Sequence, residues 1–102
     1  MLYLVLLTYV EPIDRVDAWL SAHRAFLAAH IESGTFLLAG RRQPRTGGLI
    51  IARADSAFTL ERIMMQDPFV RSGVARFDIV AFEPSAGLPD WMEAATVVEA
   101  AS

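Results

Sequence analysis

The first apolar segment of the chain has no polar face. Residues 2–9, LYLVLLTY, carry apolar side chains at both odd and even positions, which predicts a strand covered on both sides. After the turn at EPID, where Asp14 is a candidate cap, apolar residues recur at helical spacing. We expect one helix from about Ile13 to Ser33, ended by Gly34. The stripe that should face the core contains Val16, Trp19, Leu20, His23, Phe26, Leu27, His30 and Ile31.

The remaining segments alternate between strand and helix patterns. TFLLAG and GGLIIARA predict two strands joined by the polar loop RRQPRT. DSAFTLERIMM predicts a helix with Asp55 or Ser56 as its cap. Pro68 breaks this helix, and VARFDIVAFEP predicts a fourth strand that ends at Pro84. The residues of this second helix that we expect to be buried are Phe58, Ile63 and Met64.

The resulting order, β-α-β-β-α-β, is the split βαβ arrangement of ferredoxin-like α+β folds. We expect residues 1–84 to form this single domain. Residues 85–102 form a C-terminal extension in this prediction, with a short helix docked on the domain or on a partner subunit. The side chains expected to dock are Trp91, Met92, Val97 and Val98.

Such a sheet has helices on one face only, so its other face needs a cover. The apolar fraction is 54% and the mean hydropathy is +0.36, which is more apolar material than one small domain readily hides. Two sheets packed face to face would cover each other. The composition therefore favours a homodimer formed through the sheet faces.

Composition excludes several other classes of function. No apolar run approaches the roughly 20 residues of a membrane-spanning helix, and MLYLVLLTYV lacks the basic start and cleavage site of a signal peptide. The absence of cysteine fits a reducing cytoplasm. A net charge of −3 without blocks of like charge argues against nucleic-acid binding. The two histidines lie seven positions apart, about 10 Å along a helix, which is too far to share a metal ion.

His23 is the first candidate for chemistry. Its place in the apolar stripe directs its ring toward the sheet, where both ring nitrogens need partners. A core histidine bonded to a backbone carbonyl is the ordinary explanation. Asp67 offers another, because a carboxylate aimed at one ring nitrogen prepares the other for proton transfer. Asp67 also precedes Pro68, so a role as a helix stop or cap would explain it without any chemistry. His30 lies near the end of the helix, where it can face the last carbonyl groups or solvent.

The segments YLVLLTY, AHRAFLAAHIESGTFLLAG, GGLIIARADS and DPFVRSGVARFDIVAFEP occur in order over residues 1–84. Together they resemble the YciI-like (YCII-related) family. The resemblance implies a dimeric α+β barrel and an acid-base pair made by a helix histidine and the aspartate of the DPF motif. These positions fall on His23 and Asp67, whereas His30 matches no motif position. The family includes a dehydrochlorinase-like member and points to muconolactone-isomerase-like barrels.

The chain departs from the family pattern after LLAG, where relatives continue with proline and this chain has RRQPRT. Arg41 is a candidate for holding a substrate carboxylate or enolate if it turns inward, while Arg42 and Arg45 suit a solvated loop. Ser72 can donate a hydrogen bond beside Asp67, or it is only a turn former before glycine.

Two functions remain open. The first is a cofactor-free lyase or isomerase, with no metal, in which His23 and Asp67 move a proton on a small anionic carbonyl compound. The alternative is a noncatalytic dimeric module that binds a small ligand in the same cleft.

Overall fold

Four strands form one antiparallel sheet in the spatial order β2-β3-β1-β4. This order confirms the ferredoxin-like α+β fold, with β1 and β3 in the centre. The computed structural model describes residues 1–87, so the predicted docked helix lies outside the described residues. Along this part of the chain the elements are β1 (Leu2–Tyr9), α1 (Ile13–Asp17), α2 (Leu20–Glu32), β2 (Phe36–Arg41), β3 (Gly47–Arg53), α3 (Ala57–Met64), α4 (Pro68–Arg71) and β4 (Ala75–Phe82).

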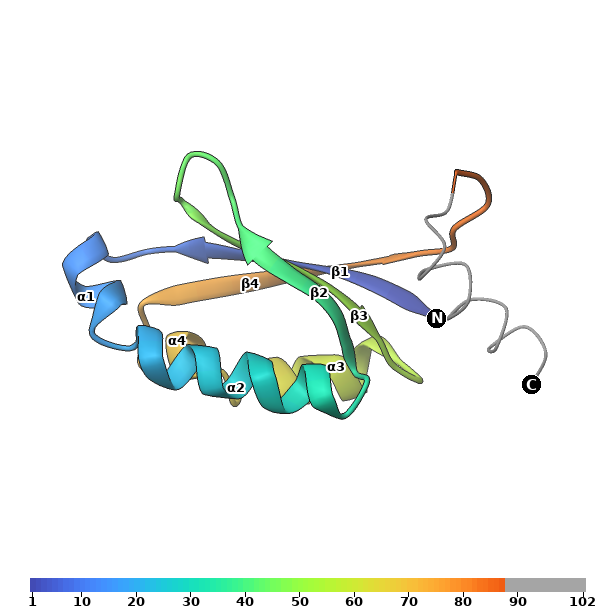
Figure 1. Cartoon of the computed structure of the whole chain (residues 1–102), viewed down its shortest axis with the longest axis horizontal. Coiled ribbons are helices and arrows are strands. Elements are labelled where there is room, and N and C mark those ends of the chain that lie inside the picture. Colours follow the sequence, from blue (N-terminus) through green and yellow to red (C-terminus); the bar gives the residue numbers. More distant parts are fainter. Residues whose placement is uncertain (88–102) are drawn as a thin grey trace.

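The core lies between the sheet and the helices α2, α3 and α4, which cover the same face of the sheet (Figure 1). Along β1, Tyr3, Val5 and Leu7 are buried in this core. Val5 pairs with Ile50 on β3 and with Ile79 on β4, so the centre of the sheet presents aliphatic side chains to the helices. Burial of each such side chain contributes about 1.5 to 3 kcal/mol to folding.

The predicted single helix from Ile13 to Ser33 is two helices in the structure, and the prediction was wrong on this point. Helix α1 ends at Asp17 and α2 begins at Leu20. Between them the amide of Trp19 donates to the carbonyl of Val16 in a tight turn, and Trp19 then adopts a nonhelical backbone conformation. Apolar residues keep their helical spacing through this break, so periodicity alone does not reveal the change of direction.

The break also changes which side chains are buried. Val16 is fully buried, but Trp19 is 44% exposed although the predicted stripe placed it in the core. Ile31, near the end of α2, is 48% exposed. Phe58 was likewise expected in the core and is 65% exposed at the start of α3, where the guanidinium of Arg62 lies over its ring. These three residues are corrections to the predicted core.

The local signals at the second helical region match the structure. Ser56 is the N-cap of α3, and its hydroxyl accepts a hydrogen bond from the amide of Thr59 at 3.2 Å. Helix α3 ends at Met64, and Pro68 occupies the first turn of the separate helix α4. Proline suits that position because it has no amide hydrogen to satisfy there. The segment between these helices brings Asp67 to the N-cap of α4.

The face of the sheet opposite the helices lies open in Figure 1. Side chains alternate along each strand, so the residues between the core positions belong to this open face. This face also carries polar side chains, because Leu6 pairs with Asp78 and Thr8 pairs with Arg76, and Arg76 and Asp78 form an exposed ion pair. Among its apolar residues, Leu38 and Val80 are 49% and 47% exposed, and the rest of those named next are half-buried. The apolar residues of the open face include Leu4, Leu6, Leu38, Ile51 and Val80. Among the residues that the structure describes, no helix has the length and apolar character to cross a membrane.

Gly47 opens β3 where the chain passes close to β1. A Cβ atom at this position would lie 1.8 Å from the carbonyl oxygen of Leu7, so the backbone itself would have to move. We predict that Gly47→Ala lowers the free energy of unfolding by about 3 kcal/mol. Gly40→Ala is the matched control, because a Cβ there meets no heavy atom within 4 Å. Urea unfolding measures both variants, and equal stabilities would contradict the close approach.

Candidate active site

His23 enters the interior from the first turns of α2. It is 7% exposed, and its ring stacks on the ring of Phe69 with centroids 3.9 Å apart and planes 9° from parallel. Phe69 comes from α4, so this stack joins two helices that are distant in the sequence. Tyr9 meets the ring of Phe69 edge-on at 5.9 Å. The imidazole is therefore held on one face by a fixed aromatic ring.

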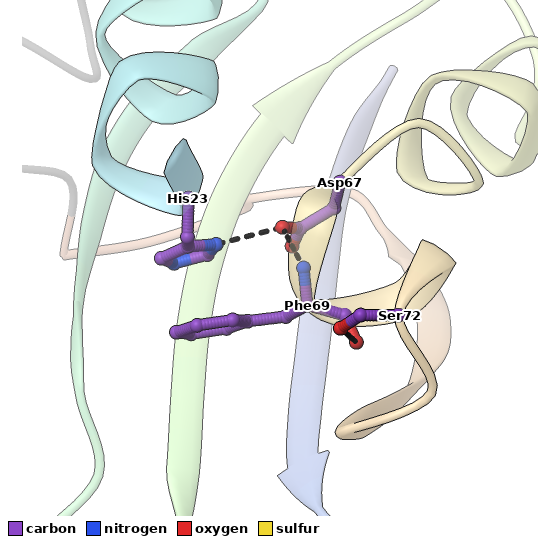
Figure 2. Close-up of polar contacts among 4 residues, drawn as sticks. All are labelled: His23, Asp67, Phe69 and Ser72. Atoms are coloured by element: carbon purple, nitrogen blue, oxygen red, sulfur yellow. Dashed lines mark hydrogen bonds and ion pairs between the residues drawn. The ribbon is translucent and has the colours of Figure 1, made fainter. Parts of the chain in front are cut away.

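Asp67 holds the same imidazole through a hydrogen bond. Its Oδ1 lies 2.8 Å from Nδ1 of His23 and also accepts the amide hydrogen of Phe69 at 3.0 Å (Figure 2). The side chain of Asp67 is completely buried. One oxygen thus caps α4 and contacts the histidine at the same time. The two explanations offered for Asp67 from the sequence describe contacts that are both present.

This contact determines which nitrogen of His23 is available. An ionised carboxylate can only accept hydrogen bonds, so pairing with an ionised Asp67 requires the hydrogen on Nδ1 and leaves the lone pair on Nε2. The second oxygen of Asp67, Oδ2, is buried and has no hydrogen-bond partner among the described residues.

A pocket of about 120 Å³ lies in front of the imidazole. His23 lines it, whereas Asp67 does not, so the carboxylate lies behind the ring as seen from the pocket. Most of the wall is apolar, and backbone at three glycines adds surface without side chains. The apolar residues are Leu7, Leu20, Leu27, Ala39, Leu49, Ile50 and Phe69, and the glycines are Gly40, Gly47 and Gly48.

The three arginines of RRQPRT have different places. Arg41 lines the pocket. Arg42 instead donates to the hydroxyl of Thr8 at 3.3 Å. Arg45 pairs with Asp17 at 2.5 Å, with its guanidinium 5.7 Å from the ring centroid of Tyr9. The hydrogen bond from Arg45 holds the pKa of Asp17 below its ordinary value.

Ser72 and His30 lie away from this pocket. The hydroxyl of Ser72 donates to the carbonyl of Phe69 at 3.4 Å, and its side chain lines a separate surface groove with Trp19. The ring of His30 packs against Phe26 and Phe36, with centroid distances of 4.8 Å and 5.0 Å. The structure thus brings together His23, Asp67 and Arg41 but not Ser72. Within residues 1–87, no group of three or more His, Cys, Asp or Glu side chains is arranged to hold a metal ion.

The family of the chain follows from its sequence match. Residues 1–83 match the YCII-related domain family. The chain belongs to this family. The match covers both His23 and the DPF segment that contains Asp67, as the resemblance described above implied.

The fold of this YCII-related protein also occurs in a solved enzyme structure. It is similar to 5-chloro-2-hydroxyhydroquinone dehydrochlorinase from Burkholderia phenoliruptrix AC1100, solved in complex with 2,5-dihydroxybenzoquinone. The TM-score is 0.69 at 20% sequence identity, covering 83% of this chain and 96% of the other. This similarity shows a shared fold. No curated protein sequence matches the chain.

Three pocket residues with polar or aromatic side chains were missed from the sequence: Tyr9, Arg24 and Phe69. Phe69 belongs to the DPF segment, so its position two residues after Asp67 could have placed it at the site. Arg24 directly follows His23 and lies outside the apolar stripe predicted for this helix. Tyr9 was counted only as part of a strand, because no local pattern marks which end of a strand borders a pocket.

The double contact of Asp67 makes a prediction for stability. Asp67→Ala leaves the amide of Phe69 and Nδ1 of His23 without a buried acceptor, and we expect it to lower the free energy of unfolding by about 3 kcal/mol. Ser56→Ala is the control, because Ser56 caps α3 without contacting a histidine, and it should cost only about 1 kcal/mol. Chemical denaturation gives both values. A loss for Asp67→Ala no larger than that for Ser56→Ala would show that the histidine contact contributes nothing.

Proposed function

We propose that this YCII-related protein is an enzyme that transfers protons with His23 and Asp67. The substrate is a small anionic carbonyl compound, and the reaction needs no bound cofactor. The observation that carries the proposal is the 2.8 Å contact between Asp67 and Nδ1 of a histidine whose ring lines a pocket. A carboxylate behind the ring and a guest in front of it are what general acid-base catalysis by histidine requires.

The proposed reaction uses Nε2 of His23, the ring nitrogen that does not contact Asp67. Nε2 of His23 removes a proton from a carbon next to the carbonyl group, and the electrons of that bond pass into the carbonyl as an enolate. The guanidinium of Arg41 is placed to stabilise the enolate oxygen or a carboxylate. Return of the proton to another carbon completes an isomerisation. Departure of a halide from the adjacent carbon, with its bonding electrons, forms a double bond and completes an elimination instead, after which His23 releases the proton to solvent.

The comparison with a solved enzyme supports the elimination branch. A protein of the same fold is named as a dehydrochlorinase and was solved with a quinone of one ring. Loss of hydrogen chloride needs a base for the proton and no redox partner, which agrees with the groups in this pocket.

The competing function is a noncatalytic module that binds a small ligand. It is favoured by the capping role of Asp67, since the contact with Phe69 gives that residue a structural purpose of its own. In such a module His23 would only donate or accept a hydrogen bond from the ligand. Catalysis and binding are separated by whether a bound compound is converted.

We predict that His23→Gln lowers the rate of conversion by about 10²- to 10⁴-fold, because positioned proton transfer contributes that much. His30→Gln, on the same helix but outside the pocket, should leave the rate unchanged. The test compounds are 5-chloro-2-hydroxyhydroquinone, small lactones and small keto acids. Chloride release and exchange of carbon-bound hydrogen in D₂O, followed by NMR, report the reaction.

Two results would count against catalysis. Equal rates for His23→Gln and the wild type would remove the histidine from the reaction. Binding of test compounds without chloride release or hydrogen exchange in the wild type would favour the noncatalytic module.

The proposal includes a homodimer that pairs the open faces of two sheets, as in the dimeric α+β barrel. Its support is the group of apolar side chains on the open face, where Leu38 and Val80 are about half exposed in the single chain. Burying apolar surface of this kind is the usual driving force for association. The proposed compartment is the cytoplasm, which suits a chain without cysteine.

The dimer is tested by placing a charge on the open face. Val80→Glu puts a carboxylate in the proposed interface, where an unpaired charge is costly to bury, and we predict monomers for this variant in sedimentation velocity. Phe58→Glu is the control, because Phe58 is 65% exposed on α3, away from the open face. A monomeric wild type, or a Val80→Glu variant that stays dimeric, would contradict this arrangement.

A further inference from the structure

The wall of the His23 pocket carries two arginines. Arg24 follows His23 on α2, and Arg41 ends β2. Both line the pocket and both are exposed, so their guanidinium groups border solvent as well as the interior. In the proposed proton transfer, Arg41 stabilises an enolate oxygen or a carboxylate. Arg24 has no role in that reaction.

The charges of these two arginines are not paired with other side chains within residues 1–87. Neither Arg24 nor Arg41 makes a side-chain hydrogen bond or ion pair in this part of the chain. Asp17 is close enough for both to lower its pKa, but its direct partner is Arg45. That carboxylate is therefore already paired with Arg45. A chain with a net charge of −3 thus has excess positive charge beside its pocket.

The size of the pocket limits what this charge can attract. Its volume is about 120 Å³, and an engineered protein cavity of about 150 Å³ is known to hold one benzene molecule. One six-membered ring is therefore near the upper limit unless part of the guest protrudes. The apolar wall suits the carbon skeleton of such a guest. A charged group on the guest would then lie beside the two arginines.

We propose that Arg24 and Arg41 form an anion clamp that makes the pocket selective for anions of one ring or smaller. The two guanidinium groups hold a carboxylate or phenolate oxygen at the solvent side, and the ring lies on the apolar wall in front of His23. Arg24 is a specificity-determining residue in this arrangement. The clamp rests on the proposed function only for the direction in which the guest is held, since anion binding itself requires no catalysis.

Calorimetric titration with three probes tests the clamp. Benzoate has one ring and a charge, benzamide has the same shape without the charge, and 1-naphthoate has the charge on two rings. We expect benzoate to bind about tenfold more tightly than benzamide, as charged hydrogen bonds permit, and more tightly than 1-naphthoate. Arg24→Gln and Arg41→Gln should each remove most of the preference for benzoate over benzamide. Arg62→Gln, which changes an arginine on α3 outside the pocket, should keep it.

The clamp is overturned if benzoate binds no more tightly than benzamide, if 1-naphthoate binds as tightly as benzoate, or if Arg24→Gln keeps the full preference. His23→Gln separates this result from the proposed function, because the variant should retain the preference within about threefold while losing conversion. Preference for benzoate in a wild type that converts no compound would leave the clamp standing without the enzyme. A wild type that converts a compound but shows no preference for benzoate over benzamide would support the enzyme and overturn the clamp.

Discussion

The hydrogen bond between Asp67 and His23 joins two helices whose positions are otherwise set by separate parts of the sheet. Its distance is 2.8 Å, and the residues are 44 positions apart in the chain. The carboxylate also caps α4, which places Phe69 against the imidazole. A buried carboxylate is costly unless it has partners, so this interaction requires α2 and α4 to meet as they do. The orientation of His23 in front of the pocket follows from it.

Close backbone contact gives the pocket its shape. Gly47 lets β3 approach the carbonyl of Leu7 at a distance that no other residue permits. Apolar side chains of α2 and of the central strands complete the wall. Polar groups enter from the helix side as His23 and Arg24, and from the end of β2 as Arg41. The site is therefore a small apolar space with one base and two cations, which is a suitable environment for stabilising a negative charge that develops on a guest.

Local patterns predicted the fold well and the site only in part. Strand alternation, Ser56 as a cap and Pro68 as a helix breaker are short-range signals, and they gave the correct order of elements. The break at Trp19 was missed because apolar spacing continues through it. His23 and Asp67 are 44 positions apart, so residue chemistry offered the pair only as one alternative, and the family resemblance pointed to both positions. Arg24 was missed because nothing in a helical sequence shows which exposed residue borders a pocket.

The most direct test of the account is the protonation pattern of His23, read from the ¹⁵N NMR signals of its ring in the free protein and with a bound anion such as benzoate. The account predicts a hydrogen on Nδ1, held by Asp67, and a ligand-induced change at Nε2 that is much larger than any change at His30. A hydrogen on Nε2 with a free Nδ1, or a ring signal indifferent to every bound anion, would contradict it.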